Sequence, residues 1–184
     1  MSITMAIWQP CAVLCLVVAC VEQTIAIKAS YERFEQFFGN EYMDFDLRVR
    51  KFNRTTMTLN GTIFINQPID DTILFTSDVF HSRLGNQQFQ HYPQHLPTSG
   101  LCSFIDNLHR DYPSAIESIE NITQMSECPV TERVMHVIDK AFPSEVIPDS
   151  LANGLWKMVF SGILNETTVI RFMISVRLTD DYMS

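Results

Sequence analysis

Alternation of apolar and polar residues with a period of two is the feature that most restricts how this chain can fold. The apolar members of the first such run are Met43, Phe45, Leu47 and Val49, and a charged residue follows each of them. Successive side chains of a β-strand point to opposite faces, so the pattern predicts a strand with one buried face and one solvated face. Half-buried strands of this kind are typical of antiparallel sheets.

A second run with the same period covers residues 57–65 and contains the pair Asn60–Gly61. This pair often forms the tight turn of a β-hairpin, which is the alternative interpretation. The apolar alternation passes through the pair without a change of phase, however. We therefore predict a continuous or bulged strand over residues 57–65.

The rest of the chain adds further strands and a helical stretch. Strand patterns cover residues 73–80, 88–92, 133–138, 155–164 and 170–178. Between residues 101 and 123 the apolar residues recur at helical spacing, and Pro113 is suited to the first turn of a helix. About seven strands with turns every eight to twelve residues, and one or two short helices, predict a mostly β protein with the architecture of an antiparallel β-sandwich in one domain.

The beginning of the chain carries an unbroken apolar run of 11 residues, Cys11 to Val21. Such a run is too short to cross a bilayer as a permanent helix and matches the core of a signal peptide. Small residues at Thr24–Ala26 fit a cleavage site, so we predict a signal peptide over residues 1–26 and a secreted domain over residues 27–184. Cleavage after Cys20, a buried cytosolic helix and a lipoprotein signal are the alternatives.

Removal of residues 1–26 changes the number of cysteines from five to two. Cys102 and Cys128 remain, and this even number of cysteines in an oxidising compartment predicts one disulfide. It would stabilise the fold by about 3–4 kcal/mol in the chain-entropy description. Two unpaired buried thiols are the alternative, whereas a metal site would need more ligands at closer spacing.

Four Asn-x-Ser/Thr triplets support passage through a secretory route. They begin at Asn53, Asn60, Asn121 and Asn165. Nine asparagines among 184 residues with 28 serines and threonines give about 1.4 such triplets by chance. We therefore predict an extracellular glycoprotein with these four asparagines as acceptors.

Composition excludes several classes of protein. The chain is 46% hydrophobic and 18% charged, with a formal net charge of −8. These values do not fit a disordered tail, a collagen or a coiled coil. A nucleic-acid partner is not expected, because binding phosphates normally requires a basic face. No second apolar run is long enough to span a membrane, so the mature protein is expected to be soluble.

Motifs that carry catalysis are absent from the sequence, so we expect no enzymatic activity and no cofactor. His91 and His95 have a metal-binding spacing only on a helix, and Pro93 between them makes a helix there improbable. The acidic pairs Asp70–Asp71 and Asp180–Asp181 offer ligands for calcium, but solvated turns and strand ends are the favoured interpretation. No metal site is predicted.

Large, pliable apolar side chains are abundant, with 13 phenylalanines and nine methionines. Methionine adapts to irregular apolar surfaces and recurs where a site accepts varied apolar ligands. A two-sheet protein either fills the space between its sheets or holds a ligand there, and transfer from water favours the ligand by about 0.8 kcal/mol per buried CH2 group. The residues themselves leave both possibilities open.

Short motifs spread along the chain resemble those of a known family. They are Phe52–Thr55, Leu59–Thr62, Cys102–Phe104, Cys128–Pro129 and Gly154–Trp156. Their order and spacing resemble the A and B type of small secreted chemosensory proteins that is expanded in insects. These proteins belong to the ML lipid-recognition superfamily and are distantly similar to the ganglioside activator. The resemblance covers roughly residues 31–181.

This resemblance implies an immunoglobulin-like sandwich that holds a lipid or another hydrophobic small molecule between two sheets. It also implies a role in the perception of contact pheromones or other chemical stimuli, with a membrane receptor as a possible partner. Cys102 and Cys128 match the motif cysteines and inherit a structural role. Characterised lipid-binding relatives have several disulfides, whereas one pair remains here.

Strand phase gives candidate residues for ligand binding. The inward-facing candidates are Phe45, Leu47, Ile63, Phe75, Phe172 and Ile174. The same residues would form an ordinary core if the space between the sheets were filled. In that case the expected function is an extracellular interaction module that binds a receptor or another secreted protein through its surface.

Overall fold

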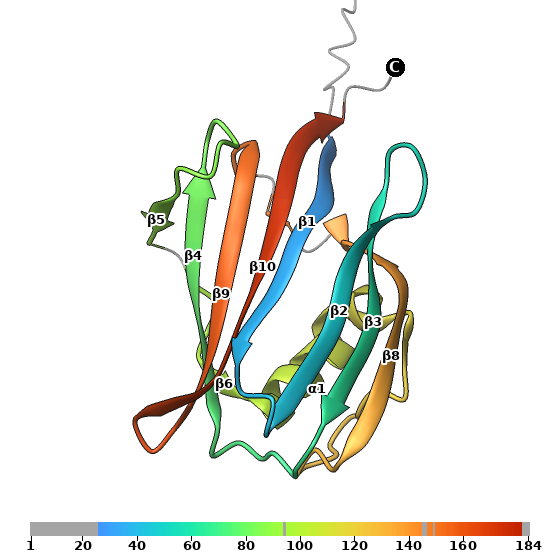
Figure 1. The fold of residues 1–184 in the computed structure, drawn as a ribbon, viewed down its shortest axis with the longest axis vertical. Helices are drawn as coiled ribbons and strands as arrows, with labels where there is room; N and C mark the ends of the chain where they lie inside the picture. The colour runs from blue at the N-terminus through green and yellow to red at the C-terminus, as the bar shows by residue number, and fades with distance from the viewer. Residues whose placement is uncertain (1–25, 94, 145–146, 149, 182–184) are drawn as a thin grey trace, which may run out of the picture.

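The computed structural model describes residues 26–93, 95–144, 147–148 and 150–181, which form two antiparallel sheets (Figure 1). Sheet A contains, in spatial order, β1 (Ala26–Phe38), β10 (Thr167–Asp181), β9 (Gly154–Leu164), β4 (Leu74–Ser82) and β5 (Gln90–Tyr92), and β6 (Ser99–Gly100) also pairs with β4. Sheet B contains β2 (Met43–Lys51), β3 (Met57–Ile65), β8 (Arg133–Ala141) and β7 (Ile119–Glu120). The predicted antiparallel β-sandwich is confirmed.

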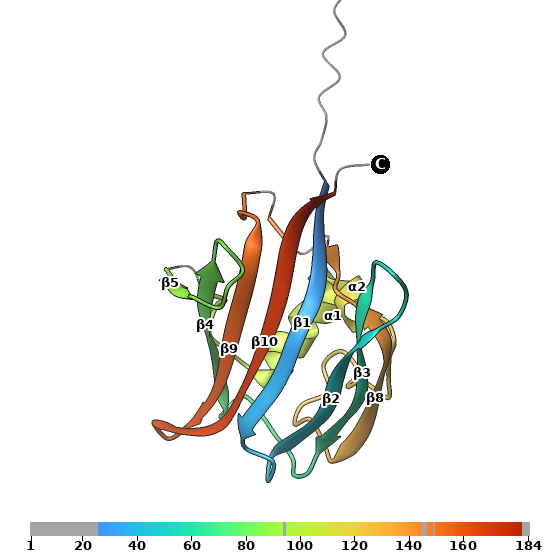
Figure 2. The ribbon, with the colours of Figure 1, turned by 45° about the horizontal axis from the view of Figure 1, so that its top comes forward.

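Two short helices complete the fold, α1 (Leu101–Asp111) and α2 (Pro113–Ile116). Figures 1 and 2 both show the sheets approaching each other at β1 and β2, with α1 behind this junction. The buried face of α1, which includes Leu101 and Ile105, packs into the core. The prediction of one or two helices between residues 101 and 123 is confirmed.

The seven predicted strands are present with ends shifted by a few residues, but the described residues form ten strands. Two of the additional strands, β6 and β7, have only two residues each. The third, β1, has a bulge opposite β10 between Tyr31 and Arg33. Tyr31 and Phe34 both pack into the core. This spacing of three breaks the alternation, which is why the sequence did not indicate a strand there.

Asn60 and Gly61 lie within β3, which pairs with β2 along its whole length. The register between β3 and β8 shifts between Leu59 and Gly61. The prediction of a continuous or bulged strand is therefore confirmed, and the hairpin alternative is wrong.

A disulfide joins Cys102, at the start of α1, to Cys128, with 5.6 Å between the Cα atoms, as predicted. Asp71 lies beside this junction and accepts hydrogen bonds from the backbone N–H (3.2 Å) and the hydroxyl (2.5 Å) of Ser103. These bonds replace the missing side-chain cap of α1, because Gly100 precedes the helix. The disulfide thus ties the start of α1 to the segment before β8, and Asp71 ties it to the turn before β4.

The predicted signal peptide over residues 1–26 lies outside the described residues except for Ala26, the first residue of β1. In the described part of the chain, no helix is long and apolar enough to cross a membrane.

An ion pair between Glu127 and Arg133 stabilises the segment that follows the disulfide. Hydrogen bonds from Arg133, and then from the backbone N–H of Gln124, lower the pKa of the Glu127 carboxyl below its ordinary value of 4.5. A folded-state pKa below the unfolded value stabilises the protein above the unfolded pKa, and this stability is lost as the pH falls through the folded pKa.

We therefore expect Glu127→Gln to be less stable than the wild type at pH 7, with the difference decreasing as the pH falls through the lowered folded-state pKa of Glu127, because the carboxyl then becomes neutral in both states. Urea denaturation over a series of decreasing pH values measures this difference. Glu132→Gln, at an exposed position of the same segment, is the matched control. A destabilisation of Glu127→Gln that stays the same over the whole pH series would show that the contribution is not ionic.

Candidate functional site

The six ligand candidates face the space between the sheets. They come from β2 (Phe45 and Leu47), β3 (Ile63), β4 (Phe75) and β10 (Phe172 and Ile174), and all belong to or pack against the two core clusters. The rings of Phe45 in sheet B and Phe172 in sheet A lie 4.8 Å apart. The structure therefore brings the predicted residues of the two sheets together.

Two further rings join this pair, and sequence reasoning did not select them as candidates. Phe34 of β1 lies 5.5 Å from Phe45, and Phe160 of β9 stacks on Phe172 at 5.0 Å. We call Phe34, Phe45, Phe160 and Phe172 the phenylalanine cluster. Phe160 has the same strand phase as Met158, so its inward direction was readable, whereas the bulge in β1 concealed Phe34.

Phe45 is fixed by a side chain of the opposite sheet. The side-chain amide of Gln36, near the end of β1, donates to the carbonyl of Met43 (2.7 Å) and accepts from the backbone N–H of Phe45 (2.8 Å). These two bonds connect the edge strands β1 and β2 where the sheets meet. They position the Phe45 ring against Phe34 and Phe172.

Burial between the sheets is uneven. Among the described residues, the largest fully buried side chains are Ile69, Ile170, Val130, Thr58, Thr123 and Ser82. Three of them, Ile69, Val130 and Ile170, share a core cluster with the disulfide residue Cys102. By contrast, all four members of the phenylalanine cluster are only partly buried, although they face the opposite sheet. Phe160 and Phe172 belong to the central strands β9 and β10 of sheet A, whose inward residues a filled sandwich would bury most completely.

The inward surface is neutral as well as apolar around the phenylalanine cluster. Burial raises the pKa of Tyr31 to about 12, so its phenol stays uncharged at physiological pH. Further along, Trp156 stacks on His81 at 4.2 Å, and its indole N–H donates to the carbonyl of Ala152. Such a surface suits contact with an apolar molecule.

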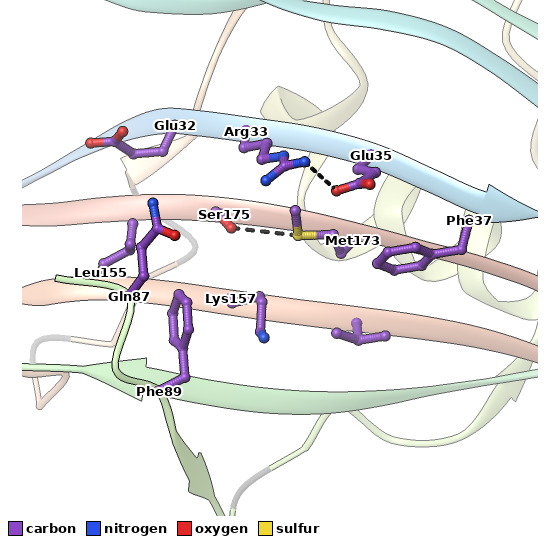
Figure 3. A pocket seen from close by; sticks show the side chains of 11 residues that line it. Glu32, Arg33, Glu35, Phe37, Gln87, Phe89, Leu155, Lys157, Met173 and Ser175 are labelled. Carbon is purple, nitrogen blue, oxygen red and sulfur yellow. Dashed lines mark hydrogen bonds and ion pairs between the residues drawn. The ribbon is translucent and has the colours of Figure 1, made fainter. Parts of the chain in front are cut away.

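A groove of about 470 Å³ lies on the opposite face of sheet A, away from sheet B (Figure 3). Its floor contains Met173 and Ser175 of β10 and Val159 of β9, and Phe37 and Phe89 stand at its sides. We call it the outer groove. A second depression of about 490 Å³ follows the β4–β5 connection and shares Phe89 with it. Sequence reasoning did not anticipate either feature.

The predicted glycosylation sites lie on the surface. Asn53, Asn121 and Asn165 are exposed, and Asn60 is partly buried with its amide donating to Asp139 at 3.1 Å. Asn53 accepts hydrogen bonds from Thr55 in the β2–β3 turn, through the backbone N–H and the hydroxyl. Attachment of sugar at these four positions stays a prediction.

One group of potential metal ligands comes together among the described residues, Asp71, Cys102 and Cys128. Both sulfur atoms are used in the disulfide, and Asp71 accepts hydrogen bonds from Ser103. This group is therefore a structural junction. His91 lies in β5, 3.7 Å from Asp78, and His95 lies in the connection after it, so the two histidines do not share a helix.

The acidic pair Asp70–Asp71 lies in the turn before β4. Asp70 accepts hydrogen bonds from the backbone N–H and the hydroxyl of Thr72, and these bonds lower its pKa. Both members of the pair thus bind protein groups of their own turn or of α1. Of the second pair, the side chain of Asp181 lies outside the described residues.

A scan against protein-family models finds no match for this chain, and a search of curated proteins finds no relative. Function is therefore inferred from the fold and from the side chains of the two surfaces of sheet A.

Proposed function

We propose that this protein is a secreted, non-enzymatic binder of a hydrophobic ligand that lies between the two sheets against the phenylalanine cluster. The incomplete burial of these four rings is the observation that carries the proposal. Aromatic rings that face an apolar interior but remain accessible gain free energy when an apolar molecule covers them, by about 25 cal/mol per Å² removed from water. The ligand completes the packing of the sandwich.

The lining defines the chemistry of this ligand. The six candidates, together with Phe34 and Phe160, provide aliphatic and aromatic contacts only. A lipid, a hydrocarbon chain or a similar apolar small molecule fits such a surface, because a charged group would be desolvated there without a partner. Resemblance to the chemosensory family supports a contact pheromone or another chemical stimulus as the ligand, delivered to a membrane receptor.

Extracellular location is supported by three features of the chain. The apolar run at its beginning has the length of a signal-peptide core, four glycosylation triplets follow it, and the two cysteines after residue 26 form a disulfide. Disulfides persist in oxidising compartments and are rare in the cytosol.

Native mass spectrometry of the protein purified from its source tests the proposal directly. We expect a mass above that of the processed, glycosylated chain, and an apolar molecule in an organic extract. A ligand-free protein that takes up no fatty acid, hydrocarbon or sterol would contradict a carrier function.

A substitution that fills the space provides a second test. We expect Ile63→Trp, beside Phe45 on sheet B, to weaken binding of an apolar fluorescent probe at least about tenfold, because the indole occupies the volume of the ligand. Its free energy of unfolding should stay within about 1 kcal/mol of the wild-type value. Probe titration and urea denaturation measure the two quantities.

The matched control is Ile138→Trp, an exposed position on the neighbouring strand β8, which should change neither quantity. A filled core predicts the opposite pattern for Ile63→Trp, with no probe binding to either protein and a loss of about 1–3 kcal/mol from overpacking. That result would favour the interaction module over the carrier.

A further inference from the structure

We infer that the outer groove is a second binding site, which takes an anionic amphiphile consisting of a carboxylate head and an alkyl chain. This site is independent of the proposed ligand between the sheets, since it uses the opposite face of β9 and β10. Both the shape and the charge of the groove support this inference.

The floor of the outer groove is apolar and well packed, although it faces away from sheet B. Leu155 and Val159 of β9 and Met173 of β10 are each only 6–7% exposed. Figure 3 shows Phe89 and Phe37 on either side of the floor. Phe37 is itself 50% exposed, so apolar surface remains available for a ligand at the end of the groove.

One cross-strand row of the groove is polar. Arg33 of β1, Ser175 of β10 and Lys157 of β9 are direct neighbours in the register of the three strands. The next row on the same face has Met173 and Val159 at its centre, with Glu35 of β1 and Asp78 of β4 at its ends. The polar row fits the head of an amphiphile, and the apolar centre of the next row fits its chain.

Charge in the groove is balanced except at Lys157. Arg33 pairs with Glu35 (2.7 Å), and Glu32 pairs with Arg177. These pairs use both carboxylates of the lining. Lys157 has no carboxylate partner among the described residues, and its ammonium lies over two rings, 4.6 Å from the centre of Phe80 and 4.4 Å from that of Phe89. Cation–π contacts position the ammonium without neutralising its charge.

Ser175 supplies a second contact for an anion beside Lys157. Its side chain is 5% exposed, and its hydroxyl donates to the sulfur of Met173 at 3.6 Å, as Figure 3 shows. A thioether is a weak acceptor, so a carboxylate oxygen would be a much better partner for this hydroxyl. The head of the ligand therefore lies at Lys157 and Ser175, and its chain extends over Val159 and Met173 toward Phe37.

Calorimetric titration with decanoate and with decanol, which has the same chain length but no charge, tests this assignment. We expect Lys157→Met to weaken decanoate binding about tenfold and Ser175→Ala about threefold, with decanol at least about tenfold weaker than decanoate on the wild type. Octanoate should bind about fivefold more weakly than decanoate, since part of the chain is buried. Thermal denaturation checks that each variant is folded.

Arg171→Met is the matched control, because Arg171 is an exposed cation of β10 outside the groove lining. It should change decanoate affinity less than about twofold. Ile63→Trp, which fills the space between the sheets, should leave decanoate affinity unchanged, and this separates the outer groove from the proposed inner site. Absence of decanoate binding, equal affinity of Lys157→Met and the wild type, equal binding of decanol, or loss of decanoate binding in Ile63→Trp would each overturn the inference.

Discussion

Replacing both Cys102 and Cys128 with alanine is expected to lower the free energy of unfolding by about 3–4 kcal/mol, because the disulfide closes a loop between residues separated by 26 positions. The disulfide also lies in the core, because Cys102 belongs to the core cluster that contains Ile69 and Val130. Ile69 and Val130 exchange backbone hydrogen bonds of 2.8 and 2.9 Å.

Thermal and urea denaturation of the double variant measure the loss, which corresponds to a decrease of about 10 °C in the melting temperature. The wild type in the presence of a reductant should behave like the variant, and this comparison separates the disulfide from the side-chain volume lost with alanine. A double variant within about 1 kcal/mol of the oxidised wild type would show that the Ile69–Val130 pairing holds this end of the sandwich without the bond.

Strands with regular alternation were predictable from the sequence, because the alternation of apolar and polar residues marks the two faces of each strand locally. In β2 and β3 the apolar phase continues from end to end, and it correctly places Phe45 and Ile63 toward the opposite sheet. β1 lacks this regularity, since its bulge shifts Phe34 by one position relative to Tyr31. A bulge is specified by pairing with a distant strand, so the sequence around it carries no clear signal.

The two candidate sites differ in how far each of them can be predicted from the sequence. Inward residues of the proposed inner site follow from strand phase, which is a local property. The outer groove depends on the register of β1, β10 and β9, which places Arg33, Ser175 and Lys157 in one row. It also depends on the approach of Phe89 to Lys157. The register and this contact join residues that are far apart in the sequence, so no single segment of the sequence indicates them.

Substitution of Gly61 by alanine is expected to be as damaging as loss of the disulfide, with a decrease of about 3 kcal/mol or more in the free energy of unfolding. Gly61 has a φ of +143°, a conformation that residues with a side chain rarely adopt. A Cβ atom at this position would lie 2.0 Å from the carbonyl oxygen of Asp46 in β2. Backbone atoms cannot move aside there without breaking the pairing of β2 with β3.

Gly85→Ala is the matched control for this prediction. Gly85 also has a positive φ, +64°, but a Cβ atom there would meet only the end of the flexible Arg177 side chain, so we expect a loss of about 1–2 kcal/mol. Urea denaturation of the two variants should therefore rank Gly61→Ala as the less stable by a clear margin. Since β2 carries Phe45 and β3 carries Ile63, the folded fraction of Gly61→Ala should also bind the apolar probe more weakly than Gly85→Ala does. Equal stability of the two variants would mean that β2 and β3 separate easily at Gly61. The proposal that sheet B forms a rigid surface against the ligand would then be wrong.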